Sequence, residues 1–450
     1  MREKRTVQAS IFEAYAEHEI GQELKAMSDW LDEHTELLDW VAADIKQRNV
    51  EETGRKGLSI ESVLRCAILK QYRQLSYEDL EFSLMDSASC QTFARLTMAW
   101  FPKKATLQGC ISAISDVTWE QINQRLLRSA EEAKKEQGKM LRIDSTVTES
   151  PIHAPSDSTL LGDSVRLLVR LLEDAEELAA GITSIEYRNH QRVAKKRVRA
   201  ICYTRGQEKK VGLYRDLIEA TRKSLGYAEQ ASKKLLAVIP VHPMGCQLWQ
   251  AEFIHYKPLI LNVIDQAERR VFNGEKVPAS EKIVSLFEEH TDIIVKGNRD
   301  IQYGHKLNLS TGKSGLILDV VIEEGNPADS DRFLPMLQRH IEQYGRAPRQ
   351  MAADGGYASI ENLQDAKALE VKDVVFHKKR GLKVEEMARS PWVYRKLRNF
   401  RAGIEAGISN IKRAYGLGRC TWKGLKHFRA YVWSSVVAHN LALFGRLVST

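Results

Sequence analysis

Cysteine motifs and long apolar segments are both scarce in this chain of 450 residues. Its six cysteines are scattered without a C-x-x-C pair, which argues against a zinc module and against a disulfide framework. The longest apolar stretch, Val432 to Leu447, is interrupted by polar side chains and is shorter than the roughly 20 residues of a membrane span. The charged N-terminus also lacks the apolar segment of a signal peptide. We therefore expect a cytoplasmic protein without membrane contact.

The composition predicts a globular protein of several domains. Hydrophobic residues make up 43% of the chain and charged residues 28%, which is typical of a protein with a sizeable core. At about 150 residues per domain, the length suggests roughly three units. Lys and Arg outnumber Asp and Glu by 67 to 59, a formal charge of +8. This excess favours a polyanionic partner without identifying one.

The first 135 residues read as helical throughout. Residues 10–50 have apolar positions at helical spacing, and we assign residues 1–50 to a helical extension that packs on the rest or on a second subunit. Residues 51–135 read as short helices joined by tight turns, with Lys103 and Lys104 just ahead of one helix. We assign this segment to a helical DNA-binding domain of the helix-turn-helix kind, although on pattern alone an ordinary helical bundle is the commoner outcome.

Strand patterns predict a mixed sheet in the remaining sequence. In residues 139–148 the apolar Leu141, Ile143 and Val147 alternate with polar residues, so Asp144 projects from the opposite face. Residues 151–290 then return to helical patterns, and three strands, alternating helices and strands, and two long helices follow. Without the helical block, this is the ribonuclease-H-like order. We therefore predict an α/β catalytic domain, residues 136–150 and 291–450, interrupted by a helical insertion.

Three acids stand where such a sheet would gather them. Asp144 lies on the first strand, Asp354 ends a later strand within AADGGYAS, and Glu405 lies on the helix after the last strand. Phosphoryl transfer on nucleic acid uses anionic oxygen ligands for two Mg²⁺ ions about 3.5–4 Å apart. The alternative for any single acid is a solvated surface carboxylate.

The helix around Glu405 has the most specific pattern in the chain. Arg401, Glu405 and Lys412 are spaced by four and seven residues, so they fall within about 40° on one helical face. One explanation is a surface ion pair worth about 0.3–0.5 kcal/mol. However, the neighbouring Phe400 and Ile404 predict a buried face beside them. We therefore expect this helix to pack on the sheet and to present its polar face to the site.

These motifs resemble those of the DDE transposases of bacterial insertion sequences. Arg401, Glu405 and Lys412 match the family pattern R-x-x-x-E-x-x-x-x-x-x-K, and the Asp-Gly-Gly-Tyr that starts at Asp354 resembles its second-acid motif. LRIDSTVT matches the first-acid motif. Arg398 stands where family members often carry Tyr, so no tyrosine role is carried over. The resemblance extends over most of the chain, includes residues 56–118 and is weakest from about 150 to 290.

The resemblance implies an enzyme that cuts double-stranded DNA at its element's terminal repeats and joins the 3'-OH ends to target DNA. Asp144 would contact both of two Mg²⁺ or Mn²⁺ ions, with Asp354 and Glu405 each holding one, while Arg401 and Lys412 would hold phosphates. It also implies a homodimer on DNA, in a bacterial cytoplasm and at the nucleoid. The alternatives are a nuclease of this fold without strand transfer and a transposase-derived DNA-binding regulator that no longer cleaves.

Two basic tracts extend the predicted DNA contacts. Between His377 and Arg429 there are 15 Lys and Arg against three acids, a local excess of 12 that exceeds that of the whole chain. The second tract lies within the helical insertion, and a solvated basic surface is the alternative for both. Besides Lys103 and Lys104, the predicted DNA-binding residues are Lys378, Lys379, Arg380, Arg398, Arg401, Lys412, Arg413, Lys195, Lys196, Arg197 and Arg199.

Overall fold

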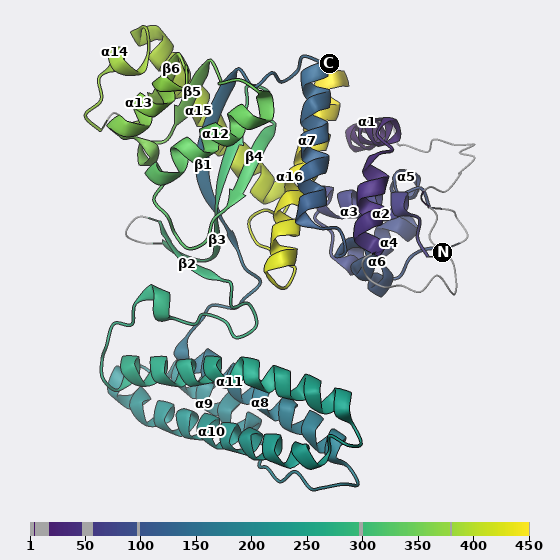
Figure 1. Ribbon diagram of the computed structural model, residues 1–450, viewed down its shortest axis with the longest axis vertical. Coiled ribbons are helices and arrows are strands. Elements are labelled where there is room, and N and C mark those ends of the chain that lie inside the picture. The colour runs from purple at the N-terminus through teal and green to yellow at the C-terminus, as the bar shows by residue number, and fades with distance from the viewer. Residues whose placement is uncertain are drawn as a thin grey trace. The chain divides into compact units, whose positions relative to one another are not determined.

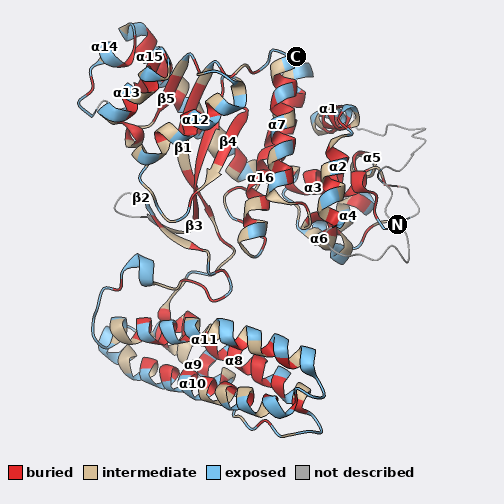
Figure 2. Cartoon of the chain, viewed as in Figure 1, coloured by how far each residue is buried: buried red, intermediate tan, exposed pale blue. Residues whose placement is uncertain are grey.

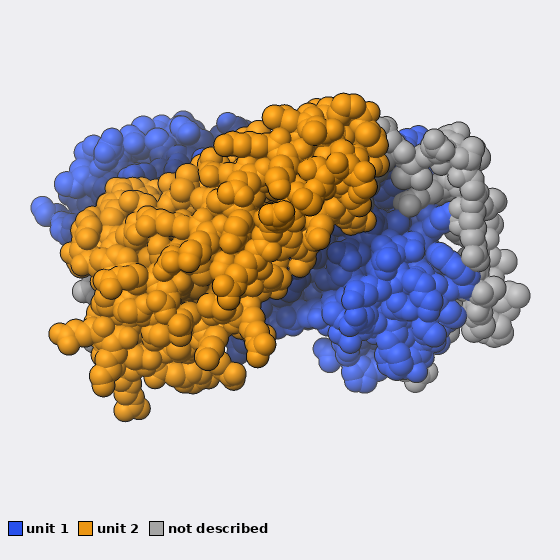
Figure 3. Space-filling model, turned by 90° about the horizontal axis from the view of Figure 1, so that it is seen from below, with its two compact units in different colours: residues 1–151, 294–450 blue, residues 152–293 orange. Residues whose placement is uncertain are grey.

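The computed structural model describes residue 4 and residues 18–46, 57–96, 100–296, 300–378 and 380–449. The chain forms two compact units, one made of residues 1–151 and 294–450 and the other of residues 152–293, which Figure 3 colours separately. Within the described ranges, none of the helices combines the length and hydropathy that crossing a membrane requires.

Seven helices precede the first strand in the described part of the chain (Figure 1). The segment predicted as helical over residues 10–50 contains, where it is described, two helices separated at residues 34–36. Ser59 and Ser76 begin the third and fourth helices by accepting hydrogen bonds from backbone N–H groups. The helices are α1 (Glu19–Glu33), α2 (Leu37–Lys46), α3 (Ile60–Tyr72), α4 (Tyr77–Asp86), α5 (Ala88–Phe93), α6 (Lys104–Ile111) and α7 (Asp116–Glu132).

The helical N-terminal part shares a hydrophobic core with the sheet. The C-terminal helix α16 (Leu425–Ser449) packs against α1, α3 and α7 and also reaches the sheet. On α16, the side chain of Asn440 accepts a hydrogen bond from Ile317 N at 2.9 Å and donates one to Asn123 Oδ1 on α7 at 2.7 Å. The predicted segment 51–135 therefore lies in the same compact unit as residues 136–150 and all but the first three residues of 291–450.

A mixed sheet forms the centre of this unit. Its order is β2-β3-β1-β5-β6, with β4 also paired to β3; β1–β3 and β3–β4 are antiparallel, and β1–β5 and β5–β6 are parallel. This mixed α/β arrangement is consistent with the predicted ribonuclease-H-like fold. The strands are β1 (Met140–Glu149), β2 (Asp292–Lys296), β3 (Asp300–Thr311), β4 (Ile317–Ile322), β5 (Gln350–Ala353) and β6 (Asp373–Phe376).

Helices cover both faces of the sheet. Since Ile143, Ala353 and Phe376 are register partners, they share a face, and Phe376 contacts Phe333 of α12 at 5.3 Å between ring centroids. The opposite face carries Arg142, whose guanidinium lies over the ring of Phe400 on α15. The helices after β4 are α12 (Phe333–Tyr344), α13 (Ile360–Ala368), α14 (Val384–Met387) and α15 (Pro391–Ala414).

The second unit, residues 152–293, is built mainly of helices. Its four long helices enclose a separate apolar core, visible as the buried inner surfaces in Figure 2. Buried Trp249 links two of them, because its indole N–H donates to the carbonyl of Leu171 at 2.6 Å. The helices are α8 (Asp157–Ala179), α9 (Gln191–Tyr203), α10 (Gln207–Lys234) and α11 (Pro243–Val271).

Candidate active site

Strand pairing brings the first two acids together. In the parallel register of β1 and β5, Arg142 pairs with Ala352 and Ile143 with Ala353. The residues that follow, Asp144 and Asp354, therefore lie next to each other on the face that α15 covers. Asp354 comes directly after β5, at the start of the short 3-10 turn Gly355–Tyr357, so the chain leaves the sheet at this carboxylate.

Helix α15 adds Glu405 and an arginine that contacts all three acids. The Arg401 Nη2 atom lies 3.0 Å from Asp144 Oδ2 and 3.4 Å from Asp354 Oδ1, and Nη1 donates to Glu405 Oε1 at 2.6 Å. The exposed fraction of the side chain rises from 14% at Asp144 to 39% at Asp354 and 60% at Glu405. The site is therefore mostly buried at Asp144 on β1 and open to solvent at Glu405 on α15.

A second arginine fixes α15 against β1. The Arg142 guanidinium donates from Nε to Thr311 Oγ1 and from Nη1 to the carbonyl of Phe400, both at 2.7 Å. It passes so close to the helix that a Cβ atom on Gly403 would lie 2.2 Å from Nη1. A glycine at this position therefore allows the contact that holds Arg401 and Glu405 over the sheet.

Tyr357 supports the site from below. Its hydroxyl donates to Asn308 Oδ1 at 2.6 Å, which joins the turn after Asp354 to β3. Burial, followed by the negative charges of Asp329 and Asp144, raises the pKa of the Tyr357 phenol well above its usual value. The hydroxyl therefore stays protonated and acts as a hydrogen-bond donor. Sequence reasoning missed Arg142, Asn308 and Tyr357 as supporting residues, although Tyr357 belongs to the quoted Asp-Gly-Gly-Tyr motif.

The donor chemistry of the three acids fits hard divalent cations. All three supply anionic oxygens, the ligands that Mg²⁺ and Mn²⁺ prefer, and they already gather around one positive charge. In the part of the chain that the structure describes, no three His, Cys, Asp or Glu side chains are arranged as a ready metal cluster. The common partner of these acids is instead the buried guanidinium of Arg401, whose Nε has no hydrogen-bond partner in that part of the chain.

Lys412 lies on a different cavity from the three acids. This cavity, of about 770 Å³, is bounded by α3, α4, the end of β1 and the segment between α15 and α16. Lys70, Glu149 and Arg419 line it together with Lys412, whereas none of the three acids does. The sequence predicts one common helical face for Arg401, Glu405 and Lys412. In the structure Lys412 lines this cavity, whereas Arg401 and Glu405 belong to the candidate site.

The other predicted DNA-binding residues divide into paired and exposed groups. Lys103 forms an ion pair with Glu81 at 2.9 Å and Lys104 one with Glu78, so both hold α6 on α4. In the second unit Arg197 pairs with Asp216 at 2.7 Å, while Lys195, Lys196 and Arg199 line a cavity of about 930 Å³. Lys379 lies outside the described residues. Lys378, Arg380, Arg398 and Arg413 are exposed as well.

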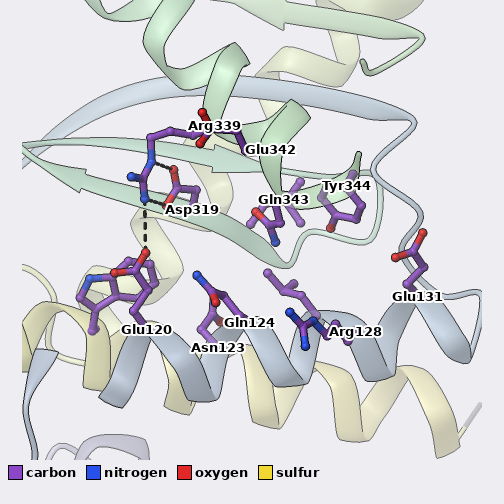
Figure 4. Close-up of a pocket in the computed structure, with 13 residues that line it drawn as sticks. Glu120, Asn123, Gln124, Arg128, Glu131, Asp319, Arg339, Glu342, Gln343 and Tyr344 are labelled. Atoms are coloured by element: carbon purple, nitrogen blue, oxygen red, sulfur yellow. Dashed lines mark hydrogen bonds and ion pairs between the residues drawn. The ribbon is translucent and has the colours of Figure 1, made fainter. Parts of the chain in front are cut away.

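A further pocket, between α7, β4 and α12, is occupied by a structural ion-pair network (Figure 4). Arg339 donates to both carboxylate oxygens of Asp319, at 2.5 and 2.8 Å, and to Glu120 at 3.3 Å. None of the three acids of the candidate site lines this pocket. We therefore assign it to the packing of α12 and α7 on the sheet.

Comparison with known families identifies the class of protein. Residues 296–441 match a family model described as Transposase DDE domain, and residues 18–109 match one described as Transposase domain (DUF772). No curated protein and no solved structure matches the chain. Both matched regions are transposase domains, which makes the chain a transposase. It belongs to the insertion-sequence DDE transposases, and DNA is the partner on which such enzymes act.

Proposed function

We propose that this protein binds the terminal repeats of its insertion sequence, hydrolyses the DNA backbone there and joins the 3'-OH ends to target DNA. The observation that supports this function is the convergence of Asp144, Asp354 and Glu405 on the guanidinium of Arg401. These acids come from two strands and a helix that are far apart in sequence. A purely structural ion pair would need one acid, whereas three acids give the site an excess of negative charge.

The acids Asp144, Asp354 and Glu405 would hold two Mg²⁺ or Mn²⁺ ions. Such ions supply activation of the attacking oxygen and stabilisation of the leaving oxygen. Without metal ions, the Arg401 side chain offsets part of the negative charge of the acids, and its planar fork can instead hold a phosphate when the carboxylates have other cations. Arg142 and Gly403 position α15, so they act on the reaction only through Arg401 and Glu405.

Basic side chains around the site would hold the DNA backbone. Arg398 and Arg413 are exposed on α15, the helix of Glu405, and Lys378 and Arg380 are exposed after β6. Contacts of this kind fix the position of DNA without reading its sequence, and they weaken steeply with salt. The cavity lined by Lys195, Lys196 and Arg199 gives the insertion a second basic surface for DNA.

Substitution of the acids tests the proposal. We expect Asp144→Asn, Asp354→Asn and Glu405→Gln each to abolish cleavage of a duplex carrying the DNA that flanks the encoding gene. Binding of that duplex should persist, since the carboxylates do not contribute to phosphate affinity. Glu385→Gln, at an exposed acid on α14, is the matched control and should cleave normally. A fully active Glu405→Gln protein would contradict the proposal and favour the DNA-binding regulator.

The same assay separates a transposase from a nuclease. A 3'-OH oligonucleotide with the element's end is incubated with supercoiled plasmid and Mg²⁺ or Mn²⁺. Covalent joining of the oligonucleotide to plasmid is expected for strand transfer, whereas plasmid nicks without joining would favour the nuclease alternative.

A further inference from the structure

Lys70 is a buried cation without an anionic partner. It lies on α3 and is 5% exposed, between the ring of Tyr77, whose centroid is 4.8 Å from Nζ, and that of Trp422, at 5.9 Å. Among the described residues, no carboxylate or carbonyl oxygen pairs with its ammonium group. Burial lowers the pKa of Lys70 to about 8, which reflects the cost of keeping this charge away from water. A side chain that serves packing alone would not need this charge.

Lys70 lines the cavity of about 770 Å³ on which Lys412 also lies. Lys104 and Arg419 complete four cationic side chains around this space. Three acids line it as well, but two of them are engaged on α4. Glu78 pairs with Lys104, and Asp79 forms the capping box with Ser76. Glu149, at the end of β1, is the third acid. The cavity is therefore lined by four cationic and three acidic side chains, and its formal excess of one positive charge corresponds to the buried Lys70.

The aromatic neighbour Trp422 carries another buried donor. The indole Nε1 of Trp422 is buried and has no hydrogen-bond partner in the described part of the chain. Trp422 does not itself line the cavity, so Lys70 is the buried donor that a ligand in the cavity would reach. A phosphodiester supplies several acceptor oxygens and one negative charge, and the aromatic neighbours leave Lys70 little conformational freedom.

We propose that this cavity binds a backbone phosphate of the element's terminal DNA, held jointly by Lys70 and Lys412. This inference rests on the proposed function, because the phosphate belongs to the DNA that the three acids would cut. Glu149 lies five residues beyond Asp144 on β1, about 17 Å along the strand at roughly 3.3 Å per residue. The bound phosphate would thus lie several nucleotides from the scissile bond, and it would connect the N-terminal helices to the signature helix α15.

The test compares Lys70→Met with Lys25→Met in the full-length protein. Lys25 is an exposed lysine on α1 paired with Asp29, so its loss controls for net charge. Affinity for a fluorescent duplex of the element's end is measured by anisotropy over a range of salt concentrations. We expect Lys70→Met to weaken binding about tenfold and to lower the salt slope by about one, with no change for Lys25→Met. The melting temperature of Lys70→Met should be unchanged or higher, since an unpaired buried charge is removed.

Arg419→Gln, at the exposed edge of the cavity, provides a second variant if Lys70→Met fails to fold. Equal duplex affinity in wild-type and folded Lys70→Met protein would overturn the inference. A second result would also overturn the inference: inorganic phosphate stabilises the protein thermally in a way that depends on Lys70, while duplex affinity does not depend on Lys70. That result would indicate a site for free phosphate. Either result leaves the proposed function standing if Glu405→Gln still loses cleavage, so the two failures are distinguishable.

Discussion

Arg401 is the residue on which the candidate site depends most directly. Three carboxylates within hydrogen-bond or ion-pair distance of one guanidinium leave the cluster with a net negative charge. Without metal, the arginine reduces the repulsion among these acids. With metal, its charge competes for the same oxygens. The Arg401 side chain therefore stabilises the folded protein without metal, and the same contacts oppose metal binding.

Arg401→Gln should make folding stability depend more strongly on divalent metal. In the absence of metal we expect the variant to unfold more easily by about 2 kcal/mol, the typical value for a lost hydrogen bond to a charged group. Mg²⁺ should then raise its melting temperature more than that of the wild type, because no guanidinium competes for the carboxylates. Thermal melting with and without Mg²⁺ measures both effects.

Arg398→Gln is the matched control, since Arg398 is exposed one turn earlier on the same helix. Its melting temperature and its response to Mg²⁺ should follow the wild type. An identical response to Mg²⁺ in Arg401→Gln and wild type would show that the guanidinium does not compete with metal.

At the scale of the element, the position of α15 depends on the absence of a side chain at Gly403. Gly403→Val would push into the Arg142 guanidinium, so either Arg142 or the helix must move. We expect a loss of about 1–3 kcal/mol of stability, the usual cost of overpacking, and a larger loss of DNA cleavage as Glu405 shifts. Denaturant unfolding and the cleavage assay measure the two effects.

Gly407→Ala on the same helix provides the comparison. A Cβ at Gly407 would meet no atom within 4 Å, so alanine should leave cleavage unchanged and stabilise the helix by about 0.5–1 kcal/mol. If Gly403→Val were as active as Gly407→Ala, the close approach of Arg142 would not position the site.

Elements with a clear period were predictable, whereas contacts between elements were not. The alternation around Asp144 and the apolar positions of α15 predicted β1 and α15 to within a residue or two. Periodicity is a local property, so it also predicted which residues face inward. It could not reveal that Lys103 and Lys104 pair with acids of α4, because those pairs depend on how two helices pack.

The candidate site shows the same difference between local patterns, which the sequence predicts, and contacts between elements, which it does not. The three acids could be predicted because motif spacing and strand ends identify them. The contacts of Arg401 with all three acids could not be predicted, because they depend on both the register of β1 with β5 and the placement of α15. Arg142 was likewise invisible, because its partners Thr311 and Phe400 lie far from it in sequence.

For the whole molecule, joining two DNA ends implies more than one subunit. Each chain carries one candidate set of three acids, while the proposed function requires both ends of an element to be cut and joined together. We expect a strand-transfer complex, assembled on the element's ends with Glu405→Gln protein to prevent cleavage, to contain at least two subunits. Light scattering gives its mass. A complex with a single subunit that holds one end would contradict the proposed homodimer.

The insertion between β1 and the rest of the sheet also affects when the site can form during synthesis. Thr146 pairs with Leu307, so β1 must wait for more than 150 further residues before it gains its antiparallel neighbour. Pairings between such distant residues form slowly, and domains generally fold as units while the chain emerges. Glu405 comes later still. A ribosome-bound nascent chain therefore holds Asp144 without its partners until almost the whole protein has been translated.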